Sequence, residues 1–282
     1  MKKKGSDLPI HCVLMTFAAL TLLPFVFVLN NSFRRTHEQY RSFFGLPEAL
    51  RNFDFVELTR GYVWSWQIFR PYMLNSLFVS ITSALGVVIV ASVSAYVFSR
   101  YRFPGHRALF LVILSFMMIP GVLTLVPSFL WVKKLGLINS YWVLILPYIA
   151  GGQIIAIFLM KGFFDGLPQE LFESARLDGA GHFAQYWHIV LPLSKQILAV
   201  VVIVNILGTW NNFLWPQVAN SDAGYSVVST GLYLMAHTQQ NAFADKSTMY
   251  AAYVISAMPL MILFIYATKP FMTGVTSGAF KA

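Results

Sequence analysis

Residues 71–99 read PYMLNSLFVSITSALGVVIVASVSAYVFS, a run that contains no Asp, Glu, Lys or Arg. A helix needs about 20 apolar residues to cross the roughly 30 Å of hydrocarbon in a bilayer, so this run is long enough to span a membrane. The whole chain has the same character, with 57% hydrophobic and 11% charged residues. Soluble domains carry roughly 25% charged residues. The sequence therefore predicts a chain that is surrounded mainly by lipid.

Five further windows lack charged residues over similar lengths, namely 8–33, 108–132, 135–160, 196–221 and 247–268. We expect membrane-spanning helices near 11–32, 75–98, 108–130, 142–160, 196–215 and 249–267. A seventh charge-free window, 223–244, carries polar residues such as Ser226, Gln239 and Gln240, so we expect it outside the bilayer or as a re-entrant helix. The predicted fold class is an all-α membrane protein with six transmembrane helices.

The first apolar run follows Lys2, Lys3 and Lys4, as the apolar region of a signal peptide would. It continues to Phe33 without a small-residue cleavage site, so we expect a retained helix. These lysines and the basic turn 100–107 favour a cytoplasmic N-terminus, and six spans return the C-terminus to the same side.

The expected organisation is a cytoplasmic tail (1–10), a first transmembrane helix (11–33), an extracytoplasmic segment (34–70), a core of five further spans (71–268) and a cytoplasmic C-terminal tail (269–282). The extracytoplasmic segment is rich in aromatic residues. Two interpretations of these aromatics stay open, an interfacial belt at headgroup depth and a docking surface for an extracytoplasmic partner.

Charge and cysteine content exclude several classes of function. The net charge of +9 is accounted for by lipid headgroups and the bias of basic residues to inner loops, so we expect no nucleic-acid partner. Cys12 is the only cysteine, which excludes an intrachain disulfide and a cysteine metal cluster. His37-Glu38 is followed by residues that break the H-E-x-x-H zinc motif, and His182 and His188 have no ligand-spaced partners, so we expect no metal site.

The inner segment 161–195 is the long, polar exception between the spans, and residues 167–192 read LPQELFESARLDGAGHFAQYWHIVLP. Pro168 suits the first turn of a helix, and Gly179 and Gly181 are stop signals. Phe172, Ala175 and Gly179 share one helical face, and two of these residues are small enough to let another backbone approach. A second short helix is expected over about 182–190. The first helix could dock on a partner protein or lie on the lipid surface.

The pattern Glu173-Ser174-Ala175, three residues, Gly179, nine residues, Ile189, one residue, Leu191-Pro192 resembles the EAA loop of ABC importer permeases, with Ser174 in place of Ala. Chance agreement at the six matching positions is on the order of 10⁻⁷. Three further stretches, 75–77, 177–180 and 210–216, resemble the carbohydrate-uptake subgroup, and the ending 274–281 is similar to the second permease of maltose-type transporters. The resemblance covers about 71–282.

This resemblance implies a type I ABC importer permease with both termini cytoplasmic, in a bacterial or archaeal plasma membrane. The helix around 168–179 would be the coupling helix, which docks on a cytoplasmic ATPase. The implied partners are a second permease subunit, two copies of the ATPase and an extracytoplasmic solute-binding protein. The implied ATPase-coupling residues are Glu173, Ser174, Ala175, Gly179, Ile189, Leu191 and Pro192, and the residues of a tail that can reach the ATPase are Gly274, Thr276, Gly278 and Lys281.

The energy source is expected on another chain. A phosphate-binding P-loop needs a Gly-Lys pair, and the sequence has none, so we expect no cofactor here and ATP and Mg²⁺ on the partner ATPase. The predicted function is therefore that of a transport subunit rather than an enzyme.

Polar side chains inside apolar spans face a partner or a water-filled path more often than lipid. The candidates for a translocation path are Gln153, Asn205, Asn211 and Asn212, with the aromatic residues Trp210, Phe213 and Trp215 close by in sequence. The alternative is that these amides join helices to one another. A permease for a non-sugar solute remains a second interpretation, and a secondary transporter or channel a weaker third, because only His11 is an ionisable group of the kind such proteins use within a span.

Overall fold

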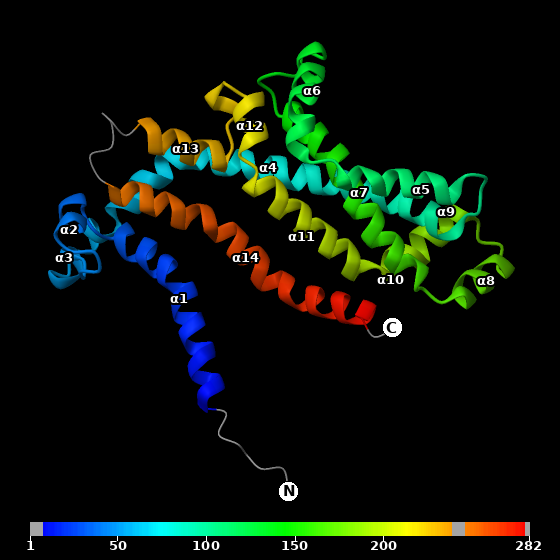
Figure 1. Cartoon of the computed structure of the whole chain (residues 1–282), viewed down its shortest axis with the longest axis horizontal. Coiled ribbons are helices and arrows are strands. Elements are labelled where there is room, and N and C mark those ends of the chain that lie inside the picture. Colours follow the sequence, from blue (N-terminus) through cyan, green and yellow to red (C-terminus); the bar gives the residue numbers. More distant parts are fainter. Residues whose placement is uncertain (1–7, 239–245, 280–282) are drawn as a thin grey trace, which may run out of the picture. The chain divides into compact units, whose positions relative to one another are not determined.

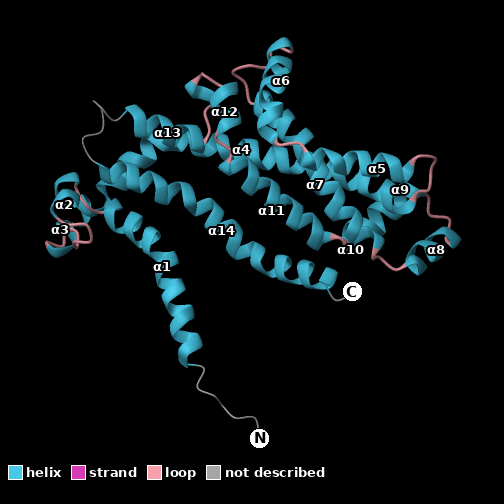
Figure 2. Ribbon diagram, in the orientation of Figure 1, coloured by secondary structure: helices cyan, strands magenta, loops and turns pink. Residues whose placement is uncertain are grey.

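The structure is a computed structural model, which describes residues 8–238 and 246–279, with side chains up to Ala267. All regular structure in these ranges is helical (Figure 2), as the sequence predicted. The elements are α1 (Leu8–Ser32), α2 (Thr36–Arg41), α3 (Glu48–Arg51), α4 (Phe55–Arg100), α5 (His106–Ser115), η1 (Phe116–Met118), α6 (Gly121–Lys134), α7 (Trp142–Asp165), α8 (Gln169–Leu177), α9 (His182–Gln185), η2 (Tyr186–Val190), α10 (Leu191–Leu193), α11 (Lys195–Asn211), α12 (Leu214–Ala219), η3 (Ala223–Tyr225), α13 (Val228–Thr238) and α14 (Lys246–Ala279). Figure 1 labels most of them along the chain.

The chain divides into two compact units. Unit 1 consists of 1–71 and 231–259, and unit 2 consists of 72–230 and 260–282. The long helices α4 and α14 each contribute to both units. Unit 2 contains α8 and all the candidate path residues, so the functional argument concerns that unit.

Four helices are long and apolar enough to cross a membrane, namely those at 9–32, 55–100, 142–165 and 246–267. Two further spans arise if each of two bent helix pairs counts as one. The first pair is 106–118 with 121–134, bent by 100°, and the second is 182–193 with 195–210, bent by 75°. The described residues therefore provide four to six candidate spans, in agreement with the six that the sequence predicted.

The bend in the predicted span 108–130 lies at Pro120. Ile119 is extended with ψ 115°, and Pro120 is the N-terminal cap of α6. A proline disfavours helical backbone in the residue before it, which ends the first half of the pair. Pro127 and Pro147 lie inside continuous helices instead. The expectation of one straight helix over 108–130 is therefore wrong, while Pro120 does act as the predicted kink.

Unit 1 begins with α1, whose apolar window is 0% buried by the rest of the chain. The segment that follows folds around Arg34, which is 1% exposed. The guanidinium of Arg34 donates hydrogen bonds to the carbonyl oxygens of Phe43 and Ser42 and to the Oδ1 atom of Asn31. Within the predicted extracytoplasmic segment 34–70, the structure thus has α2, α3 and the first turns of α4.

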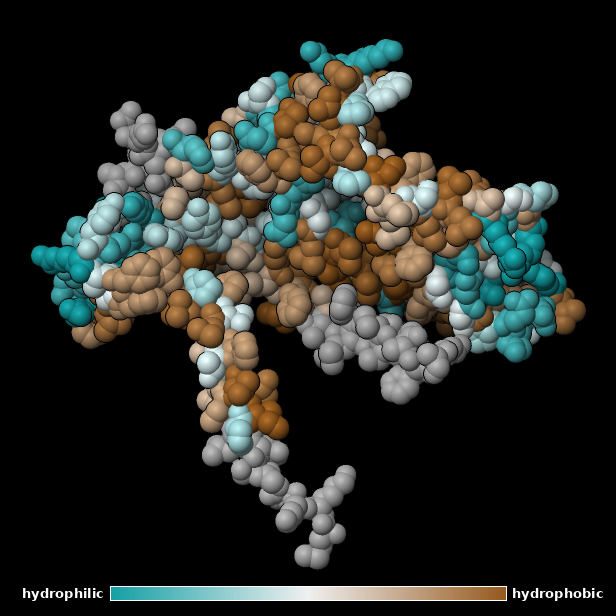
Figure 3. Space-filling view, viewed as in Figure 1, coloured by the Kyte–Doolittle hydropathy of each residue, from teal (hydrophilic) through white to brown (hydrophobic). Residues whose placement is uncertain are grey.

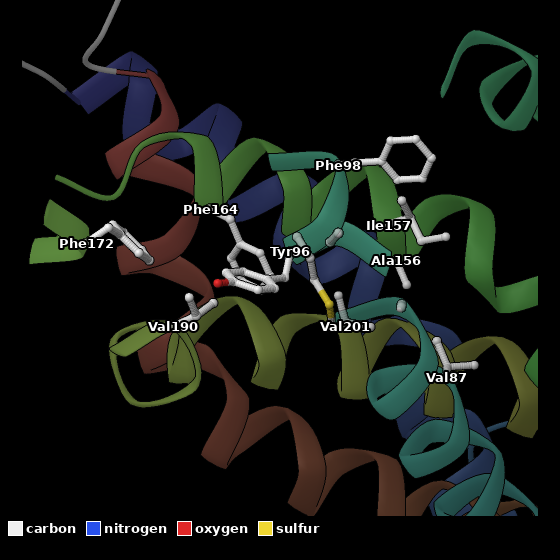
Figure 4. Close-up of a cluster of buried hydrophobic side chains, with 12 residues drawn as sticks. Val87, Tyr96, Phe98, Ala156, Ile157, Phe164, Phe172, Val190 and Val201 are labelled. Carbon is white, nitrogen blue, oxygen red and sulfur yellow. The ribbon is translucent and has the colours of Figure 1, made fainter. Parts of the chain in front are cut away.

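Unit 2 has two buried apolar cores. One core lies where α4, α7, α8 and the start of α11 meet, and Figure 4 shows its side chains. The other joins α4, α7 and α12 with the ends of α6 and the loop before α13. Figure 3 shows hydrophobic side chains over the surface of α5, α6 and α7 and hydrophilic ones around α8. This distribution is the one expected for spans that face lipid and a loop that faces water.

Candidate functional site: an exposed helix and an adjoining cavity

Helix α8 begins and ends where the sequence predicted. Pro168 is its N-terminal cap, and the helix covers Gln169–Leu177. At its C-terminal end Gly179 has φ +81°, the left-handed conformation that glycine adopts without strain. The amide of Ala180 donates to the carbonyl of Ala175 at 2.8 Å, and the amide of Gly179 donates to that of Arg176 at 3.0 Å. These two bonds form a Schellman cap, which satisfies carbonyl groups that the end of a helix otherwise leaves free.

The two faces of α8 have different environments. Phe172 is 1% exposed, and its ring is directed toward Phe164, Tyr96 and Val190 (Figure 4). Leu177 on the other side is 91% exposed. The face through Phe172 is therefore used to fix α8 to its own chain, which corrects the expectation that this face is open to a partner.

The first three residues of the predicted coupling motif lie on or beside the open surface of α8. Glu173 and Ser174 are exposed, and Ala175 is half-buried. Gly179 is exposed as well, and a Cβ atom added to it would meet no atom within 4 Å. The motif thus presents a carboxylate, a hydroxyl and a smooth backbone turn to the outside.

The second half of the motif lies in α9, η2 and α10. Ile189 and Leu191 are half-buried, and Ile189 packs against the core that contains Phe172. Pro192 is exposed within the short helix α10. Buried Gln185 donates a hydrogen bond of 2.9 Å to the carbonyl of Ala180 and so ties this half to the end of α8. The structure therefore gives these later motif residues a packing role and leaves the earlier ones exposed.

Arg100, the last residue of α4, contacts this loop in a way that the sequence did not predict. Its Nη2 atom donates to the carbonyls of Phe164 at 2.6 Å and Leu167 at 3.2 Å. Its Nη1 atom donates to Oε1 of Gln169 at 3.2 Å, and its guanidinium carbon lies 3.9 Å from the ring centroid of Phe172. A basic residue at the end of an apolar run indicates topology, and nothing in its local sequence indicates these distant contacts.

A cavity of about 330 Å³ lies in unit 2 between α4, α7 and α11. Asn205 and Asn212 line it, together with Tyr148 and small residues of α7 such as Gly151 and Gly152. The Oδ1 atom of Asn205 is buried and has no hydrogen-bond partner among the described residues. A second hollow of about 520 Å³ shares Tyr148, Gly151 and Asn212 with the first and extends toward α6.

The structure brings together only part of the predicted path. Asn205 and Asn212 line the same cavity, but Gln153 does not line it, and its Nε2 atom donates to the carbonyl of Ile149 within α7. Asn211 is exposed, and its side chain donates back to the carbonyl of Leu207.

The aromatic residues near the predicted path are placed differently from one another. Trp210 is 4% exposed and lines neither hollow, whereas Trp215 lines the larger one. The indole of Trp215 donates to the carbonyl of Val143, so it also fixes α12 to α7.

The candidate tail residues are described only in part. The backbone of α14 continues through Gly274, Thr276 and Gly278, and nothing is described of their side chains. Lys281 lies outside the described residues. The contact of this tail with an ATPase stays a prediction.

His37, Glu38 and Glu48 place their ligand atoms within 4.8 Å of one another in unit 1. The carboxylate of Glu38 is already used, because it accepts hydrogen bonds from the backbone amides of Arg35 and Glu48. The exposed carboxylate of Glu48 lies 3.4 Å from Arg41. These contacts join α2 to α3, and we assign the cluster this structural role.

An all-helical chain with several lipid-facing spans, a polar-lined cavity between them and a capped helix that stands free of them defines a multi-pass membrane transport subunit. Residues 87–271 match the family described as binding-protein-dependent transport system inner membrane component, and the chain belongs to this family. It is thus an inner membrane component of an ABC importer.

Two curated relatives and one solved structure extend this finding. The chain is 30% identical to the diacetylchitobiose uptake system permease of Streptomyces coelicolor, over 96% of this chain and 88% of that protein. It is 32% identical to the arabinooligosaccharides transport system permease of Halalkalibacterium halodurans, over 100% of both. A crystal structure of a bacterial ABC transporter that imports the acidic polysaccharide alginate shares the fold, with a TM-score of 0.76 and 22% identity over 95% of this chain and 99% of the matching chain. The type I importer permease fold predicted from the sequence is thereby confirmed.

Proposed function

We propose that this chain is the permease subunit of an ATP-driven sugar importer, in which it forms half of the translocation path. The observation that carries the proposal is the construction of α8. Phe172 fixes the helix to the membrane-embedded core, while Glu173, Ser174 and Leu177 remain exposed on its outer side. A short helix held rigidly on one side and open on the other is suited to receive a push from a partner protein.

The partner at α8 is an ATPase subunit in this proposal. The carboxylate of Glu173 can accept hydrogen bonds or an ion pair at the contact, and exposed Leu177 offers an apolar anchor. ATP and Mg²⁺ bind the ATPase, which is present in two copies. A second permease subunit completes the path, and a solute-binding protein delivers the solute on the opposite side. Both termini and α8 lie in the cytoplasm.

Closure of the two ATPase subunits would displace α8, and the spans packed against it would follow as a rigid body. ATP binding can drive this change only because the two states of the permease present different surfaces to the ATPase. The Schellman cap and the buried ring of Phe172 make α8 stiff enough to transmit the displacement.

The proposed substrate class is an oligosaccharide. The cavity between α4, α7 and α11 offers the side-chain amides of Asn205 and Asn212 and the ring of Tyr148. Amides bond sugar hydroxyls, and aromatic faces stack on sugar rings. The two relatives named above are described as permeases for diacetylchitobiose and for arabinooligosaccharides, which supports this class.

The test is purification of the chain in mild detergent from its native membrane, with and without Glu173→Ala. We expect the unaltered chain to carry along a second permease and a P-loop ATPase. Glu173→Ala should insert at normal abundance, retain less ATPase and transport less solute. The control is Asp165→Ala, since Asp165 pairs with Lys161 of its own helix at 2.6 Å. Unchanged transport by Glu173→Ala at normal abundance would refute the role given to α8.

A further inference from the structure

Three side chains of α4 hold the loop that contains α8. Ser92, Tyr96 and Arg100 are spaced by four residues and therefore lie on one face of α4. The hydroxyl of Ser92 lies 2.7 Å from that of Tyr186, and the hydroxyl of Tyr96 donates to the carbonyl of His182 at 3.3 Å. These two contacts hold the chain after α8, and Arg100 holds the chain before it.

The guanidinium of Arg100 caps the end of α7. The last carbonyls of a helix have no partner within it, and a charged donor satisfies them well. Arg100 donates to the carbonyls of Phe164, in the last turn of α7, and Leu167, just beyond it. One planar group thereby fixes the direction in which the chain leaves α7.

The same group also reaches α8 itself. Its flat face lies over the ring of Phe172, with 3.9 Å between the guanidinium carbon and the ring centroid, and its Nη1 atom donates to the side chain of Gln169. The positive charge is attracted to the face of the ring, and the contact is stronger where water is excluded, as around the buried Phe172. Arg100 thus joins the end of α4, the end of α7 and the start of α8 in a single set of contacts.

We propose that Arg100 is the positioning residue that makes α8 move together with α4, so that a displacement of α8 reaches the spans. This inference rests on the proposed role of α8 as the ATPase-docking helix. Arg100 lies on the inner side of Phe172 and takes no part in the docking surface itself. Without it, α8 would still bind the ATPase, but the ATPase would move α8 with less effect on α4.

The test uses the complete transporter in proteoliposomes, with Arg100→Ala, Arg100→Lys and the control Arg102→Ala. Arg102 is exposed two residues away and has a similar charge environment at the start of the same turn. Three quantities are measured: ATPase retained on purification, ATP hydrolysed in the presence of loaded binding protein, and solute transported. The ratio of solute transported to ATP hydrolysed is the readout that a loss of folding alone would not change.

We expect Arg100→Ala to retain the ATPase at the normal amount while solute transported per ATP falls by roughly 2- to 30-fold, the range found for residues that couple two sites. Arg100→Lys should restore this ratio only in part, because lysine keeps the charge but lacks the planar fork and the stacking face. Arg102→Ala should behave like the unaltered chain. A normal ratio in Arg100→Ala and Arg100→Lys would overturn the proposal.

The two proposals fail in different ways. If α8 does not dock on an ATPase, Glu173→Ala retains ATPase and transports normally. If only the role of Arg100 is wrong, Glu173→Ala loses transport while Arg100→Ala keeps a normal ratio of solute to ATP. Where Arg100→Ala does not accumulate in the membrane, Arg100→Lys decides the question, since it preserves charge and most of the volume.

Discussion

Replacement of Gly179 by alanine should loosen the C-terminal end of α8 by an amount that the structure defines. Gly179 has φ +81°, and an added Cβ atom would meet nothing within 4 Å, so steric contact with neighbours contributes nothing. The cost is that of the backbone conformation alone, about 1–2 kcal/mol for an L-residue in the left-handed region. Gly181 is the matched control, because its Cβ would also meet nothing within 4 Å and its φ of −69° suits any residue.

The assay is hydrogen–deuterium exchange of the peptide that contains the amides of Gly179 and Ala180, which form the Schellman cap. A cost of 1–2 kcal/mol predicts exchange faster by about 5- to 30-fold in Gly179→Ala, as local opening becomes easier. Gly179→Asn should show a smaller increase, since asparagine tolerates this conformation better than alanine. Gly181→Ala should leave exchange unchanged. Equal exchange in Gly179→Ala and Gly181→Ala would refute the assignment of strain to the backbone at Gly179.

Three further variants test the packing around the site. Phe172→Ala should lower the stability of the purified chain by about 3–5 kcal/mol, because it leaves a cavity in the core, whereas Leu177→Ala on the exposed side should leave the thermal transition unchanged. A Cβ atom on Gly152 would lie 2.6 Å from Asn205, so Gly152→Ala should cost about 1–3 kcal/mol and reduce transport. Gly151→Ala, which meets nothing within 4 Å, should melt normally, and equal melting of the two glycine variants would contradict this account. Asn75→Leu removes hydrogen bonds to the carbonyls of the turn at 224–226 and should cost about 1–3 kcal/mol, measured as earlier thermal unfolding and faster proteolysis of that turn.

Charge-free windows predicted the lipid-facing helices well because a span is selected for apolar composition over a fixed length. The same signal predicts helix ends poorly. Helix α4 begins at Phe55 and not near residue 75, since the charged and aromatic residues of 55–70 mask a helix that hydropathy alone does not register. Helix α11 ends at Asn211, where Asn212 turns to an extended backbone, and not at 215. Apolar composition determines where lipid is tolerated, but the end of a helix depends on local caps.

The start and end of α8 could be predicted because Pro168 and Gly179 act through the backbone of their own segment. The direction in which Phe172 points could not, since helical spacing defines which residues share a face without showing which face the core will cover. The grip of Arg100 on Phe164 and Leu167 joins residues more than 60 positions apart, with separations of 64 and 67. A contact over such a separation follows from the fold, and no local pattern announces it.

The loop after α8 contains a wide helical turn, the π-helix η2 at Tyr186–Val190. Such a turn accommodates one more residue than an ordinary helical turn, and the helix on either side continues. The interval of nine residues between Gly179 and Ile189 includes part of this extra length. Loss of one residue here would turn everything beyond it by about 100° and advance it by about 1.5 Å. The half-buried Ile189 and the whole of α11, with Asn205 at the cavity, would then face the wrong neighbours. The spacing of the motif is therefore a setting of rotational phase: in this loop, the number of residues matters as much as their identity.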